Sequence, residues 1–138
     1  MLNEMFKSII DQDRAAVVIC DTECKIVYMN PAAIAQYHGD ITGRDLRECH
    51  NSKSVDKIER VVEWFGKNRK NNIVFTHHND KHNRDVYMIA LRNSKGELIG
   101  FYEKHEYRTA EAAKPYALQS CNIFPHNRNK IIAVEDNL

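Results

Sequence analysis

Apolar and polar residues follow a helical period at the start of the chain. The apolar ones recur at the i, i+3, i+4, i+7 and i+8 spacing, which gathers them into one stripe: Leu2, Met5, Phe6, Ile9 and Ile10. The pattern predicts a short amphipathic helix over residues 1–11. Such a stripe needs another surface to pack on, and we expect a second copy of the chain to bury it in a homodimer.

Two short runs rich in Val and Ile come next. The segments "AAVVIC" (15–20) and "KIVYMN" (25–30) predict the two strands of a hairpin, and Asp21 favours the turn between them by accepting bonds from nearby backbone amides. The pair Asn30-Pro31 then marks a break, because proline is well tolerated in the first turn of a helix. Residues 31–39 are therefore predicted to form a short helix that ends at Gly39.

A longer helix is predicted over residues 54–65, with Ser54 as its cap. Its apolar residues fall on one face: Val55, Ile58, Val62 and Phe65. Strand-like runs follow over residues 72–79, 84–93 and 97–108. Two strands, a group of helices and three more strands predict an α+β fold, with helices packed on one face of a five-stranded antiparallel sheet.

Residues 109–138 carry prolines and only weak periodicity, so we expect a linker and C-terminal tail there. The predicted organisation is an N-terminal amphipathic helix (1–11), one folded domain (12–108) and this tail.

Composition narrows the class of protein. Apolar residues make up 43% of the chain and charged residues 28%, as in ordinary folded proteins. The formal net charge is +1 and no basic block stands out, which argues against direct binding of nucleic acid. No apolar run approaches the roughly 18 residues of a membrane span, and we expect a cytoplasmic protein. The four cysteines match neither a disulfide framework nor paired zinc knuckles, so they are expected to be reduced thiols.

Three linked stretches resemble one family. They are "VVICDTECKIVYMNPAAIAQYHG", then "ITGRDL", then "VYMIALRNSKGELIGFYEKHEYRT". Together they resemble a PAS domain, a small sensor and interaction module of signalling proteins, over about residues 12–108. The resemblance implies a five-stranded antiparallel PAS fold and a non-enzymatic role in signal transduction, with a signalling partner that it does not identify. It also implies either a small ligand between sheet and helices or pairing with another PAS domain.

The stretch "GRDLRECHNSKSVDKIERVVEWF" is similar to one bacterial PAS subgroup, which carries a Cys-His-x-x-x-Ser helix junction. Adjacent residues of a helix point about 100° apart, so Cys49 and His50 are not expected to form a catalytic dyad. His50 or His38 could serve as the axial ligand of non-covalently bound haem, which is the alternative function. Leu46 stands where covalent haem attachment or a flavin photoadduct would each need a cysteine, and this argues against both.

No metal site is expected, because neighbouring residues of a strand, such as His77 and His78, point to opposite faces. If the PAS pocket binds a ligand, we expect apolar and polar-tipped side chains of the helices and the inner sheet face to line it. These candidates are Ile34, Tyr37, Leu46, Cys49, His50, Ile58, Val62, Phe75, Tyr87, Ile89 and Phe101. Apolar residues at such periods also describe an ordinary packed core. The homodimer is expected to use the N-terminal stripe and the outer face of the sheet.

Overall fold

A computed structural model describes residues 1–117, and the chain divides into one unit of residues 1–108 and a second of residues 109–138. Residues 109–117 form neither helix nor strand, and the rest of the predicted tail, 118–138, lies outside the described residues. Within the described part, no helix has the length and apolar character needed to span a bilayer. The cytoplasmic location stays a prediction.

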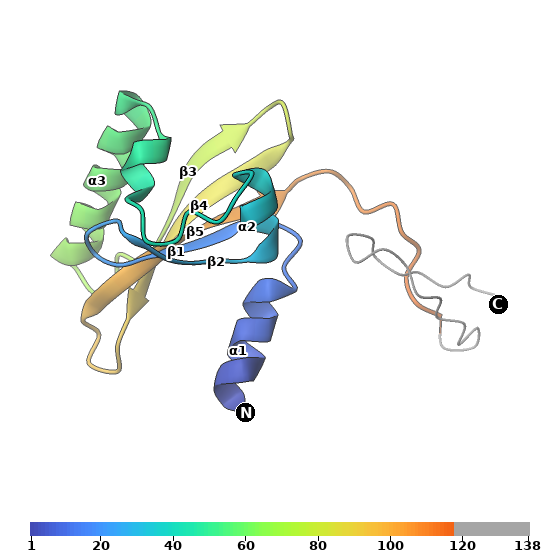
Figure 1. The fold of residues 1–138 in the computed structure, drawn as a ribbon, viewed down its shortest axis with the longest axis horizontal. Coiled ribbons are helices and arrows are strands. Elements are labelled where there is room, and N and C mark those ends of the chain that lie inside the picture. The colour runs from blue at the N-terminus through green and yellow to red at the C-terminus, as the bar shows by residue number, and fades with distance from the viewer. Residues whose placement is uncertain (118–138) are drawn as a thin grey trace. The chain divides into compact units, whose positions relative to one another are not determined.

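The first unit contains helices and strands in the predicted order (Figure 1). The elements are α1 (Leu2–Asp11), β1 (Val17–Cys20), β2 (Ile26–Met29), α2 (Pro31–Gln36), the 3-10 helix η1 (Leu46–Cys49), α3 (Ser52–Lys67), β3 (Ile73–Asn79), β4 (Arg84–Arg92) and β5 (Leu98–Tyr107). The strands form one antiparallel sheet in the order β2-β1-β5-β4-β3. The prediction of an α+β fold with a five-stranded antiparallel sheet is confirmed.

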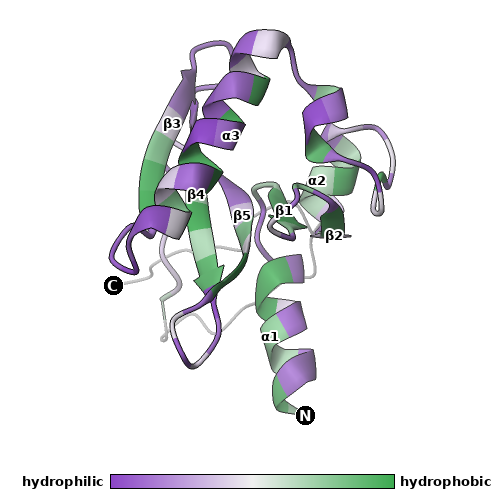
Figure 2. Cartoon of the chain, turned by 90° about the vertical axis from the view of Figure 1, so that its left-hand side faces the viewer, coloured by the Kyte–Doolittle hydropathy of each residue, from purple (hydrophilic) through white to green (hydrophobic). Residues whose placement is uncertain are grey.

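The helices that follow β2 cover one face of this sheet. Helix α2 contacts β1 and β2, whereas α3 contacts β4 and β5. The core lies between these layers, and its largest fully buried apolar side chains are Val18, Ile26, Leu46, Phe65, Met88 and Phe101. Helix α1 stands apart from these layers and has no buried residue (Figures 1 and 2).

Helix α3 begins two residues before the predicted start, and its cap is Asn51 rather than Ser54. The Asn51 side chain accepts a hydrogen bond from the backbone N–H of Ser54 at 2.9 Å. This bond satisfies one of the amides that every helix leaves free in its first turn. Ser54 therefore serves as the donor of the capping contact, and its own hydroxyl is not needed for the cap.

Asn30 ties three elements together because its side chain is fully buried and bonded on both sides. Its Oδ1 accepts from the backbone N–H groups of Val17 and Ala33, at 2.9 Å each. Its Nδ2 donates to the carbonyls of Ile10 and Ala15, at 3.0 Å each. One amide thus links the end of α1, the start of β1 and the first turn of α2.

Gly100 allows β1 and β5 to approach each other closely. A Cβ atom at this position would lie only 2.3 Å from the backbone oxygen of Cys20. Because that neighbour is backbone, it cannot rotate away, and only glycine fits here.

Candidate functional site

A cavity of about 210 Å³ lies between the helical layer and the ends of β3, β4 and β5. The lining residues come from the end of α2, from His50 just before α3, from α3 itself and from the three strands. They are Gln36, Tyr37, His50, Ser54, Lys57, Ile58, Thr76, His77, Asn79, Arg84, Val86, Met88, Glu103 and His105. The mixture of charged, polar and apolar groups is typical of a binding site rather than of a core.

A buried acid and a buried imidazole lie side by side on β5. Glu103 and His105 are 6% and 5% exposed, and the His105 Nε2 lies 3.3 Å from the Glu103 Oε1. Either ring nitrogen of His105 can donate or accept, according to which of them carries a hydrogen. The other ring nitrogen of His105, Nδ1, is buried and has no hydrogen-bond partner among the described residues.

Arg84 lines the same cavity at the start of β4. The register pairs Val86 with His105, so Arg84, two residues away, lies diagonally across from His105 on the same face. The Nε atom of Arg84 is buried without a hydrogen-bond partner in the described part of the chain. The cavity therefore brings together two buried polar atoms, on Arg84 and His105, that no described group satisfies.

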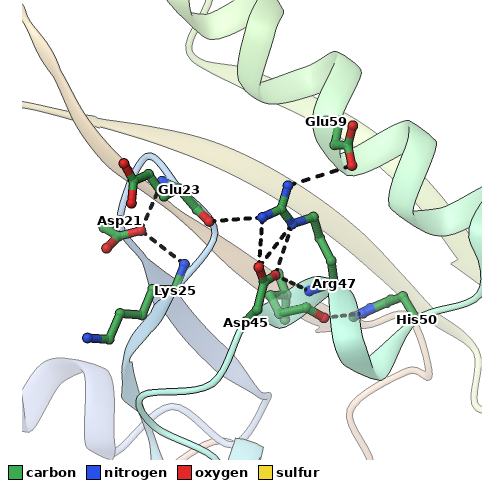
Figure 3. A network of polar contacts seen from close by, with 8 residues as sticks. Asp21, Glu23, Lys25, Asp45, Arg47, His50 and Glu59 are labelled. Atoms are coloured by element: carbon green, nitrogen blue, oxygen red, sulfur yellow. Dashed lines mark hydrogen bonds and ion pairs between the residues drawn. The ribbon is translucent and has the colours of Figure 1, made fainter.

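His50 is held in place by the segment around η1 (Figure 3). Its Nδ1 lies 2.9 Å from the carbonyl oxygen of Leu46, and because a carbonyl can only accept, Nδ1 carries a hydrogen and donates it. Asp45 caps η1 by accepting from the backbone N–H of Arg47 at 2.8 Å. These contacts fix the position of His50 and keep a hydrogen on its Nδ1.

Arg47 connects η1 to α3 and to the turn between β1 and β2. Its guanidinium binds Asp45 through two nitrogens, at 2.9 and 2.7 Å, and lies 3.7 Å from the Glu59 carboxylate on α3 (Figure 3). It also donates to the carbonyl of Glu23, in the turn between β1 and β2, at 3.4 Å. The Arg47 guanidinium lowers the pKa of Asp45, so this carboxylate stays ionised.

Two further lining residues add polar groups. Burial raises the pKa of the Tyr37 phenol, so this group is a neutral donor near the cavity. Lys57 is exposed on α3, and its Nζ donates to the carbonyl of Thr76 at 2.8 Å, which links α3 to β3.

The structure divides the predicted ligand-binding residues. Tyr37, His50 and Ile58 line the cavity. Leu46 and Phe101 are buried in the core, and Ile34 and Val62 pack against it. Cys49 is exposed and does not line the cavity. The η1 turn thus directs the adjacent Cys49 and His50 to different environments.

Phe75, Tyr87 and Ile89 were predicted on the inner face, and this placement is wrong. Val86 and Met88 are buried beneath the helices, so Tyr87 and Ile89, which alternate with them, point to the outer face. The register pairs Phe75 with Tyr87, and their rings pack at 5.5 Å. Because both faces of β4 carry apolar residues, periodicity alone could not separate inside from outside.

The prediction missed Arg84, Glu103 and His105. Glu103 and His105 follow Phe101 at intervals of two, so the inward placement predicted for Phe101 could have identified them. His77 had no such sequence cue. An irregularity in the pairing between Phe75 and His77 shifts the alternation of β3, and it places His77 opposite Val86 on the cavity side.

In the part of the chain that the structure describes, no group of three or more His, Cys, Asp and Glu side chains could hold a metal ion. The Nδ1 atom of His78, on β3, lies 2.5 Å from the carboxylate of Asp85, on β4.

The sequence of residues 3–105 matches the profile of the PAS domain family, and this span covers most of the chain. The chain belongs to the PAS domain family. PAS domains are generally sensory modules without catalytic activity, and this one is accordingly a sensor domain of signal transduction. Its membership of the subgroup with the Cys-His-x-x-x-Ser junction stays a prediction. No curated protein sequence is similar enough to match.

Solved structures share the fold at low sequence identity. A PAS domain from Colwellia psychrerythraea has a TM-score of 0.61 at 12% identity, over 79% of this chain and 98% of that one. The PAS domain of BvgS from Bordetella pertussis has a TM-score of 0.59 at 16% identity, over 80% and 89%. A sensory box sensor histidine kinase from Vibrio cholerae has a TM-score of 0.55 at 15% identity, over 77% and 90%.

Proposed function

We propose that this PAS domain senses a small molecule bound in the cavity formed by Arg84, Glu103, His105 and the helices above them. One observation carries the proposal: the Nδ1 atom of His105 is buried without a partner. A buried polar atom without a hydrogen bond costs about 1–3 kcal/mol, so folded proteins rarely keep one, and an ordered water, an ion or a ligand in an adjoining cavity usually satisfies it. The cavity beside it supplies the space.

A ligand in this cavity would touch both layers of the domain. Lys57 and Ile58 belong to α3, His50 is held by η1, and His105 belongs to the sheet. Binding shifts a conformational equilibrium only as far as the ligand contacts one state better than another. A molecule that bridges α3 and β5 would stabilise one spacing of the two layers, and this spacing is the proposed signal.

Mass spectrometry tests the ligand directly. Purified protein is denatured, and the released small molecules are compared with those from the variant Ser54→Trp, in which an indole fills the cavity. We expect a molecule that the wild-type protein releases in stoichiometric amount and the variant does not. Equal release from both proteins, with both folded by circular dichroism, would place the ligand elsewhere. No release, together with no binding from a metabolite panel, would refute the proposal.

We also propose that the domain forms a homodimer through α1 and the outer face of the sheet. The α1 residues Leu2, Met5, Phe6 and Ile9 are all more than half exposed, as are Ile73, Phe75 and Ile99 on the sheet. A groove of about 320 Å³ between α1 and the outer face includes Ile9, Ile10, Ile19, Leu91 and Tyr102. A second copy would bury these apolar side chains.

Light scattering coupled to size exclusion tests the dimer. The double variant Phe6→Asp with Ile9→Asp places two charges on the apolar stripe and should yield monomers. The matched control, Asn3→Asp with Ser8→Asp, alters polar positions of the same helix and should leave the dimer intact. A wild-type protein that is monomeric at high micromolar concentration would refute this interface.

The cavity fits haem poorly. Its volume of about 210 Å³ is below the roughly 300 Å³ at which pockets for drug-sized ligands begin, and haem is a large ligand of that class. His38, the other predicted axial ligand, is exposed and does not line the cavity. His50 keeps a free Nε2, but the charged groups around it are unsuited to an apolar macrocycle. The geometry favours a smaller, polar ligand.

A further inference from the structure

The charges around the cavity are unbalanced. Arg84 and Lys57 are cations, and Glu103 is the single carboxylate among the described lining residues. Glu103 already has a partner, since its carboxylate lies 3.3 Å from His105. Arg84 is half-buried, and no hydrogen bond or ion pair joins its guanidinium to another described residue. Because burial keeps water from the Nε atom of this guanidinium, an anion in the cavity would supply the acceptor that Nε lacks.

We propose that the ligand is a short-chain monocarboxylate, whose carboxylate accepts hydrogen bonds from Arg84. This inference rests on the proposed function of the cavity and adds the chemical class of its ligand. The planar guanidinium presents parallel N–H groups that match the two oxygens of a carboxylate. Its unpartnered Nε is one donor of such a fork.

The remaining lining residues limit what the carboxylate is attached to. Ile58, Val86 and Met88 provide an apolar wall, on which a short carbon chain can pack and an inorganic phosphate cannot. Arg84 is the one Lys or Arg among the described lining residues that is not exposed, so a second carboxylate would find no buried cation to pair with, which argues against dicarboxylates. The volume of about 210 Å³ leaves room for only a short chain.

Lys57 plays a different part from Arg84. Its ammonium is exposed and donates to the Thr76 carbonyl, so water satisfies the rest of its hydrogen bonds. An exposed cation attracts anions towards the site but holds them weakly. The structure therefore assigns the main carboxylate contact to Arg84 alone.

Nuclear magnetic resonance titration of the full chain tests the ligand class. The probes are butyrate, its uncharged analogue butyramide, and inorganic phosphate. We expect butyrate to shift the amides of the lining residues saturably and to bind at least tenfold more tightly than either other probe. Arg84→Gln should weaken butyrate binding by about 10- to 100-fold, the usual loss for a charge-assisted hydrogen bond.

Two further variants separate the local contact from general effects. Arg60→Gln removes the same charge from an exposed position on α3, where Arg60 pairs with Asp56, and should leave the butyrate affinity within about twofold. Arg84→Lys keeps the charge but removes the paired N–H donors of the guanidinium, so we expect a loss of butyrate affinity between those of the wild type and Arg84→Gln. The amide spectrum of each unbound variant shows whether it is folded.

The outcomes distinguish this inference from the proposed function. If butyramide binds as tightly as butyrate, if phosphate binds more tightly, or if both Arg84 variants keep full affinity, the carboxylate class is wrong while the cavity remains a binding site. If butyrate causes no shift and mass spectrometry finds another molecule in the cavity, the class is again wrong. If no probe and no metabolite binds there, the proposed function fails as well.

Discussion

Replacement of Asn30 by alanine should destabilise this PAS domain more than almost any other polar substitution. The side chain is fully buried and bridges elements that are distant in the sequence. Alanine would remove the acceptor for the backbone amides of Val17 and Ala33. It would also remove the donor for the carbonyls of Ile10 and Ala15. No water can reach the buried members of this set without opening the junction of β1 and α2.

The size of the loss follows from these contacts. A buried donor or acceptor left without a partner costs about 1–3 kcal/mol, and loss of a helix N-cap costs about 1 kcal/mol. The contacts to Val17, Ala33 and Ala15 are buried, whereas the one to Ile10 is partly open to solvent. We therefore expect Asn30→Ala to lower the free energy of unfolding by about 3–5 kcal/mol, against a typical total of 5–15 kcal/mol.

Urea denaturation followed by circular dichroism measures this loss, and Asn93→Ala is the matched control. The Asn93 side chain also accepts two backbone bonds, from Lys95 at 2.9 Å and Glu97 at 3.0 Å, but it is exposed. Water can replace these bonds, so Asn93→Ala should lower the free energy of unfolding by less than about 1 kcal/mol. If the two variants lose the same free energy within 1 kcal/mol, burial is not what makes the Asn30 contacts important.

Three further predictions concern packing, thiol reactivity and pH. Gly100→Ala should cost about 1–3 kcal/mol by the same assay, because the new methyl group meets the Cys20 carbonyl; an unchanged midpoint would show that β1 and β5 can separate freely. In a Cys121→Ser background, iodoacetamide should modify the exposed Cys49 in the native protein, but Cys20 and Cys24 only in urea, because both are buried and burial raises the pKa of each thiol. Equal labelling rates would contradict this order. Hydrogen bonds from Arg108 and His78 hold the pKa of Asp85 below its usual 3.8 in the folded protein. The ionised Asp85 therefore stabilises the fold above pH 3.8, and this stabilisation is lost as the pH falls through the lower pKa of the folded state. Thermal melts should therefore show Asp85→Asn less stable than wild type at about pH 5 and similar to it near pH 2, and a gap of constant size would refute the assignment.

The arrangement of elements could be predicted from the sequence because helix and strand periods are local properties. The Val- and Ile-rich runs, the Asn30-Pro31 break and the stripe of α1 each indicated the element that the structure contains. The predicted start of α3 was two residues late, because asparagine and serine are both good caps and the backbone geometry, which selects Asn51, is not visible in the sequence. Family membership followed from several such local features in a fixed order.

The candidate site could be predicted only in part. Tyr37, His50 and Ile58 were expected at a pocket and line the cavity. The charged members of the site were overlooked, because charged residues in an exposed-looking strand usually face solvent. Arg84 and His105 are covered only because α3 and the segment around His50 lie across the end of the sheet.

The sequence by itself determined which elements form, in what order, and which family they make up, since a helix or strand of this length is encoded in its own period. The tertiary structure decided which face of each strand lies under the helices. That choice depends on register: the irregularity between Phe75 and His77 places the exposed His77 opposite Val86 at the cavity, and the pairing of Val86 with His105 brings Arg84 beside the buried Glu103–His105 pair. The cavity and its unpaired cation exist only because strands distant in the sequence are hydrogen-bonded in that register, and no local pattern carries this information.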